Sequence, residues 1–180
     1  MPRQYAASQS CYTSLKLYFQ VPILLLELRV ENYAVIENTA VEFAPGLNLL
    51  TGETGAGKSI LIDALALLLG ARAAGDLIRH GAEKAVLTAV FHAGNATSCT
   101  LQENGLEAAG EELILRREIA AGGKGRIFIN NQPATVAVLK QLAPLLAVIH
   151  AQNESLAAFD AAEKLRLLDR YVAIEAAPVT

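Results

Sequence analysis

Apolar and polar residues alternate in several short stretches of the chain, which is the pattern of strands with one buried face. From Leu24 onward this pattern predicts a strand over Leu25–Glu31, a turn at Asn32-Tyr33 and a second strand over Thr39–Phe43. Pro45-Gly46 then interrupts the chain before the sequence LNLLTG (47–52), which is apolar on both faces. A third strand of that kind is typical of the buried centre of an α/β sheet.

Later segments carry periodic patterns as well. SILIDALALLLGA (59–71) is apolar on nearly every face and predicts a buried helix with Gly70 as its C-cap. Two alternating segments joined by a glycine-rich loop predict a hairpin in a small β layer, with Asn130-Asn131 as a second tight turn. The other predicted elements are a strand at 85–93, the hairpin strands at 112–119 and 126–134, a helix at 135–146, a strand at 145–149 and a helix at 159–174.

The composition bounds the number of domains and the class of partner. At 180 residues the chain fits one domain of ordinary size. Lys and Arg total 15 against 18 Asp and Glu, so the net charge of −3 gives no general attraction for nucleic acid. Any nucleic-acid contact would therefore require a local basic patch.

The first residues give no sign of a membrane segment. Residues 1–22 are mostly polar and are expected to form a poorly structured extension. The apolar run over 21–26 is far shorter than the about 20 residues that span a bilayer. The two cysteines, Cys11 and Cys99, lie at neither a C-x-x-C nor a zinc-binding spacing. We therefore expect a cytoplasmic protein with no membrane partner.

The sequence GETGAGKS (52–59) fits G-x-x-x-x-G-K-[ST], the spacing of a loop that wraps the phosphates of a nucleotide. Its glycines let consecutive backbone N–H groups point toward one anion, at the positive end of the helix that follows. Lys58 would contact the β and γ phosphates, and the Ser59 hydroxyl would be a ligand of Mg²⁺. The expected ATP-binding residues of this loop are Gly52, Glu53, Thr54, Gly55, Ala56, Gly57, Lys58 and Ser59.

A second part of the site is expected just past the predicted strand at 145–149. Polar residues beyond the carboxyl end of a buried strand are where α/β sheets build ligand sites. Gln152 is the candidate there, because a neutral amide ligates Mg²⁺ or positions a water without titrating. ATP would then be held by the loop and Gln152, and Mg²⁺ by Ser59 and Gln152.

The chain carries only half of a hydrolytic site. A P-loop enzyme that hydrolyses its nucleotide also needs an acidic residue at the end of a second apolar strand, to hold Mg²⁺ and orient water. The apolar run at 145–149 closes on His150, and Asp169 lies in a helical pattern. We therefore expect no complete catalytic set here, and an isolated chain that binds ATP but hardly turns it over.

Basic residues gather after the predicted P-loop helix and in the hairpin. Arg72, Arg79, His80 and Lys84 form a small cluster around glycines. It is either a solvated loop or a contact with DNA or nucleotide, for which Arg72 and Arg79 are the candidates. The hairpin residues Arg116, Arg117, Lys124 and Arg126 are expected to form a solvated rim. His80 and His92 are expected at the surface or a strand edge, because no second metal ligand lies at a suitable spacing.

Six separated blocks of the sequence resemble, in their order, the N-terminal lobe of the SMC-like ABC ATPase heads. They cover roughly residues 24–172 and are LLELRVENYAVIE, LTGETGAGKSILIDAL, GARAAGDLIRHGAEKA, GRIFINNQPAT, IHAQNES and KLRLLDRY. Within that group the resemblance is greatest to heads that act in DNA double-strand-break repair and recombination.

The resemblance implies a fold and a division of the chain. The fold would be an α/β P-loop NTPase, the N-terminal lobe of an ABC/SMC-type head, with a mixed sheet, a small antiparallel β layer and flanking helices. After the extension over 1–22, residues 23–160 would form the lobe. Residues 161–180 would form a helix that leads toward a coiled coil.

The resemblance also implies roles and partners. Residues 52–59 would be the Walker A loop, Gln152 the Q-loop ligand, and Arg72 an arginine near nucleotide and DNA. The partners would be the C-terminal lobe of the same protein, a second head in a homodimer that sandwiches ATP, and DNA of the nucleoid. Ala151 and Asn131 stand where the family usually has glycine. The first puts the flexibility of the Q-loop in question, whereas Asn tolerates the left-handed region.

Two other classes stay open from the sequence. A P-loop small-molecule kinase would explain the loop and the size, but it would need an acidic catalytic residue and a basic lid, and no clear lid is visible. A nucleotide-regulated binding module without hydrolysis would also fit.

Overall fold

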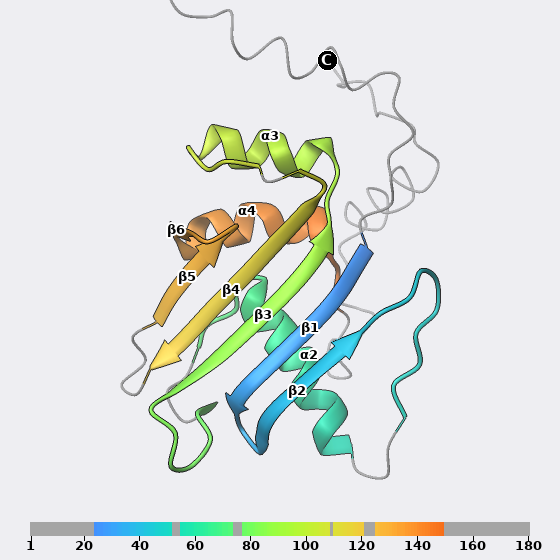
Figure 1. The fold of residues 1–180 in the computed structure, drawn as a ribbon, viewed down its shortest axis with the longest axis vertical. Coiled ribbons are helices and arrows are strands. Elements are labelled where there is room, and N and C mark those ends of the chain that lie inside the picture. The colour runs from blue at the N-terminus through green and yellow to red at the C-terminus, as the bar shows by residue number, and fades with distance from the viewer. Residues whose placement is uncertain (1–23, 52–54, 74–76, 109, 121–124, 150–180) are drawn as a thin grey trace, which may run out of the picture. The chain divides into compact units, whose positions relative to one another are not determined.

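The described part of the chain is built around one six-stranded sheet (Figure 1). The structure, a computed structural model, describes residues 24–51, 55–73, 77–108, 110–120 and 125–149. In the order in which they lie side by side, the strands are β2 (Ile36–Glu42), β1 (Leu24–Tyr33), β3 (Lys84–His92), β4 (Glu112–Ala120), β5 (Gly125–Ile129) and β6 (Gln132–Ala134). The helices are α2 (Gly55–Leu68), α3 (Asn95–Glu103) and α4 (Val136–Leu146). All these elements lie in the first of the chain's two units, Met1–Val148.

Neighbouring strands of the sheet are antiparallel in every described pair. The hairpin strands β4 and β5, expected in a small β layer, are continuous with β1 and β3 in the same sheet. Their alternating residues give the sheet one buried face, because a strand turns successive side chains to opposite sides. In Figure 1, α2 and α4 pass behind the sheet, and their buried residues form one core cluster with that face.

The predicted end of the P-loop helix is confirmed. Gly70 has a φ of +98°, a left-handed conformation that glycine adopts without steric cost. Its N–H donates to the carbonyl of Leu67 at 3.1 Å, and the N–H of Ala71 donates to that of Ala66 at 3.0 Å. These two bonds form a Schellman motif, which ends α2 and fixes the direction of the chain after Gly70.

The second predicted tight turn is also confirmed. Asn130 and Asn131 have φ values of +49° and +64° and connect β5 to β6. Asparagine tolerates this region, so its presence at 131 in place of glycine is compatible with the turn. The Asn130 side chain accepts from the N–H of Ile114 at 3.0 Å and donates to the carbonyl of Glu107 at 3.2 Å, which ties the turn to β4 and to the loop before it.

The third predicted strand is wrong for its described residues. Residues 47–51 have no regular secondary structure, and the side chains of Leu47 and Leu49 are 96% and 80% exposed. A strand needs a neighbour for its backbone groups, and both edges of β1 are already paired, with β2 and with β3. The segment therefore has the composition of a core strand but no partner within the part of the chain described.

Three smaller predictions also differ from the structure. The strand expected at 145–149 is wrong, because α4 continues through Leu146 and residues 147–149 are irregular. The first turn lies at Ala34-Val35, since β1 extends through Tyr33, which pairs with Ile36. Helix α3 was not predicted, because its polar sequence NATSCTLQE buries only Thr97 and Leu101.

Candidate nucleotide-binding site

Helix α2 begins inside the P-loop motif, at Gly55, and carries Lys58 and Ser59 near its first turn. Lys58 is partly buried and Ser59 is exposed. The described residues of this first turn include no acidic side chain, so nothing in that turn opposes an anion at the positive end of the helix. Lys58 and Ser59 therefore lie where the motif requires a cation and a metal-ligating hydroxyl.

The space around Gly57 shows whether the N-terminal end of α2 leaves room for a phosphate. A methyl group added at Gly57 would meet no protein atom within 4 Å. Protein packing therefore does not require glycine at this position. Open space beside a helix N-terminus instead fits the close approach of a phosphate to the backbone.

Several predicted site residues lie outside the described residues. They are Gly52, Glu53, Thr54 and Gln152, together with Ala151 beside Gln152. Gly55 and Ala56 are placed in α2 by their backbone alone. Their roles in binding ATP and Mg²⁺ stay predictions.

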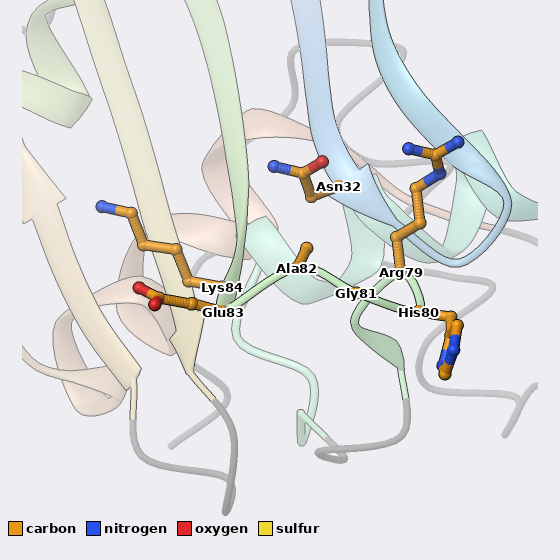
Figure 2. A pocket seen from close by; sticks show the side chains of 7 residues that line it. All are labelled: Asn32, Arg79, His80, Gly81, Ala82, Glu83 and Lys84. Atoms are coloured by element: carbon orange, nitrogen blue, oxygen red, sulfur yellow. The ribbon is translucent and has the colours of Figure 1, made fainter.

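The basic cluster after α2 is spread over two places. Arg72 is exposed just past the end of the helix. Arg79 and Lys84 border an open pocket of about 440 Å³, together with Asn32, His80, Gly81, Ala82 and Glu83. Figure 2 shows the ends of the Arg79, His80 and Lys84 side chains pointing away from one another rather than into a common centre. The pocket therefore offers no single cradle for one anion.

Ion pairs already engage two of these cations. Arg79 lies 3.0 Å from the Glu37 carboxylate, and Lys84 lies 3.3 Å from that of Glu118. Both are surface pairs of the kind that contribute at most about 1 kcal/mol each and exchange readily for another anion. His80 is exposed, and within the described ranges no group of three or more His, Cys, Asp and Glu side chains is arranged to hold a metal.

Arg117 was expected on the solvated rim, and that prediction is wrong. Its residue is only 6% exposed, and its guanidinium donates to the carbonyl of Leu67 at 2.5 Å and to that of Ala71 at 2.7 Å. Burial lowers the pKa of this guanidinium from its usual value. Arg stays protonated nonetheless, so it supplies a charge at the negative end of α2. Its position in the sequence already held the signal: Leu113, Leu115, Arg117 and Ile119 alternate on the buried face of β4.

Comparison with known proteins defines the class. The model of a family described as an AAA domain matches residues 27–105. A solved structure described as "Structural biochemistry of ATP-driven dimerization and DNA stimulated activation of SMC ATPases" has a TM-score of 0.59 to this chain. The similarity covers 82% of this chain and 98% of that one at 20% sequence identity, which is evidence for the fold alone. The chain has the fold of a lobe of the SMC-like P-loop ATPase heads.

Sequence similarity identifies the group within that class. The chain is 38% identical over 154 residues to the DNA repair protein RecN of Bacillus subtilis, and 39% identical over 150 residues to RecN of Vibrio cholerae. These matches cover 84% and 82% of this chain and 27% of each relative. The chain thus belongs to the RecN proteins, and it spans about a quarter of the length of the relatives it matches.

Among the described residues, no helix is both long enough and apolar enough to cross a membrane.

Proposed function

We propose that this chain is the ATP-binding N-terminal part of an SMC-like ATPase head that acts in DNA double-strand-break repair and recombination. The observation that carries the proposal is a helix that starts within the P-loop motif and presents Lys58 and Ser59 at its first turn, on a lobe of the SMC-like fold. The similarity to RecN supports the role in DNA repair. In this proposal residues 52–59 and Gln152 bind ATP, and Ser59 and Gln152 hold Mg²⁺.

The exposed apolar side chains support a second lobe as partner. Leu47 and Leu49 are largely exposed in a segment that has the composition of a core strand, and Ile62 on α2 is 40% exposed. Exposed apolar side chains that follow closely in one segment, as in 47–51, are typical of a surface that another part of a protein covers. We infer that a C-terminal lobe of the same protein covers residues 47–51 and supplies the acidic strand end that the chain's sequence lacks.

The proposal extends to the organisation of the whole protein. Residues 1–22 would be an extension, 23–160 the lobe, and 161–180 a helix leading toward a coiled coil. Hydrolysis would require the C-terminal lobe and a second head in a homodimer, in the cytoplasm and on nucleoid DNA. The SMC ATPase to which the chain is similar in fold is described as undergoing ATP-driven dimerization and DNA-stimulated activation, which supports this organisation.

The test of the proposed site is the dependence of ATP affinity on Mg²⁺. We expect Mg²⁺ to tighten ATP binding by the wild-type chain and to have a much smaller effect on Ser59→Ala, because the variant loses a ligand of the metal. Titration of both chains with ATP, in Mg²⁺ and in a chelator, measures this difference. Thr88→Ala, which removes a hydroxyl from β3, is the control. An equal Mg²⁺ effect in wild type and Ser59→Ala would remove Ser59 from the metal site.

A second experiment tests the DNA contact proposed for Arg72 and Arg79. If both meet phosphates, the whole protein with Arg72→Ala and Arg79→Ala should show a salt slope of DNA binding reduced by about 2, since each phosphate contact contributes about 1. Because Arg79 lies beside Glu37, its contribution would require exchange of that carboxylate for a phosphate. Arg29→Ala, on β1, removes another exposed guanidinium as a control. An unchanged slope in the double variant would show that the two arginines are ordinary solvated surface.

A further inference from the structure

Arg117 connects the centre of the sheet to the far end of the P-loop helix. It lies on β4 opposite Leu87 of β3 and Ile127 of β5, so its backbone is fixed on both sides by strand pairing. Its guanidinium nitrogen Nη1 donates to the carbonyls of Leu67 and Ala71, which precede and follow the turn at Gly70. One side chain therefore holds the last turn of α2 and the first residue after Gly70 against the sheet.

The C-terminal end of α2 carries a negative partial charge that a nearby cation stabilises. The Schellman bonds give the carbonyls of Ala66 and Leu67 backbone donors but supply no positive charge. The described residues of the last turn of α2 include no basic side chain that would neutralise this charge. Arg117 supplies both a donor and a positive charge from 50 residues away in the sequence. If the guanidinium were removed, the carbonyl of Ala71 would lose the side-chain donor that the structure gives it.

The position of the C-terminal end of α2 affects the position of its N-terminal end, which carries the P-loop residues. The buried residues of the helix, Ala64, Leu67 and Leu68, all lie in its C-terminal half. In the half that carries the P-loop, Gly57 and Ser59 are exposed, and Ile60 and Leu61 are only partly buried against the core. A helix of 14 residues is about 21 Å long, so a rotation of about 5° at the anchored end moves the loop end by about 2 Å. Contacts to phosphate do not tolerate a displacement of that size.

We infer that Arg117 is a positioning residue for the nucleotide site: it holds the C-terminal end of α2 to strand β4 and thereby sets where Lys58 and Ser59 lie. The consequence for nucleotide rests on the proposed function, whereas the anchoring of the helix does not. The same contact holds Ala71, so it also affects the position of the next residue, Arg72.

Amide hydrogen exchange and MgATP titration of the whole chain test the inference, with Arg117→Met as the variant. The amides of Leu69, Gly70 and Ala71 donate to carbonyls in the last turn of α2 and report its opening. In Arg117→Met we expect these amides to exchange about tenfold faster or more, while amides in the paired strands β1 and β3 keep their wild-type rates. MgATP should bind more weakly by about threefold to tenfold, because the loop end is no longer held in place.

Two variants separate positioning from general stability. Arg116→Met removes the neighbouring guanidinium, which lies on the opposite face of β4 and pairs with Glu118, and it should match wild type in both measurements. Arg117→Lys keeps a positive charge and a donor at the helix end and should restore most of the protection and affinity. If Arg117→Met fails to fold, Arg117→Lys still tests the inference. Its amides at 69–71 should exchange somewhat faster than those of wild type.

The outcomes decide the inference in either direction. Wild-type exchange at 69–71 in both Arg117 variants would show that the residue does not anchor the helix. Faster exchange spread equally over β1, β3 and α2 would show only a loss of overall stability. Unchanged MgATP affinity despite local opening would remove the positioning role. If the wild-type chain bound no MgATP, the proposed function would fail, and the exchange data alone would decide whether Arg117 anchors α2.

Discussion

The isolated chain is expected to bind MgATP and to hydrolyse it on the order of 10³ to 10⁵ times more slowly than the same chain combined with its C-terminal lobe. In the proposed function the loop, Lys58 and Ser59 would bind phosphates and metal, whereas the groups that orient the attacking water and stabilise the transition state are expected from other parts of the protein. Steady-state hydrolysis by the chain, with and without the added lobe, measures the difference. The exposed Leu47 and Leu49 predict that the two parts associate when mixed.

Lys58→Ala is the control for this reconstitution, and it should abolish the restored hydrolysis. Lys84→Ala should leave it intact, since Lys84 is a surface residue paired with Glu118. Strong hydrolysis by the purified chain alone, lost in Lys58→Ala, would contradict the proposal. It would mean that a complete site is encoded within these 180 residues.

The second large effect is expected in binding rather than turnover. Lys58→Ala should weaken the binding of MgATP by about tenfold or more, because charge-assisted hydrogen bonds contribute roughly 1.5 to 3 kcal/mol each and about 1.4 kcal/mol corresponds to a factor of ten. Isothermal titration calorimetry of the isolated chain measures both affinities.

The matched control is again Lys84→Ala, which removes one positive charge at a distance in sequence from the P-loop and should bind MgATP like wild type. Equal affinities of Lys58→Ala and wild type would exclude the loop from the nucleotide site. An equal loss in both variants would instead indicate a general electrostatic effect of net charge.

The sequence could predict most elements whose signals are local. The alternation over 112–119 predicted β4, Gly70 marked the end of α2, and Asn130-Asn131 marked the turn between β5 and β6. The same alternation placed Arg117 on the buried face, yet the residue type led to its assignment as a solvated rim. Arginine is rarely buried without partners, and its two carbonyl partners, Leu67 and Ala71, could not be seen from the neighbouring sequence.

The P-loop motif could be recognised for a related reason. The motif, with Lys58 and Ser59, is a short continuous stretch, but the helix expected from Ser59 begins four residues earlier, at Gly55. That Ala64, Leu67 and Leu68 are buried while Ile62 is exposed depended on which face of α2 the sheet covers. An all-round apolar helix gives no indication of that face.

The sequence by itself determined the properties that depend on a few neighbouring residues: where α2 ends, the alternation of side chains along β4, and the tight turn with positive φ at Asn130-Asn131. Only the tertiary structure decided the strand order β2-β1-β3-β4-β5-β6, the partners of Arg117 and the absence of regular secondary structure in residues 47–51. Helix caps and turns are made of bonds between residues close in sequence, so their signals are local. Strand pairing and the burial of a charge require partners from distant parts of the chain, and an apolar segment becomes a strand only where such a partner lies beside it.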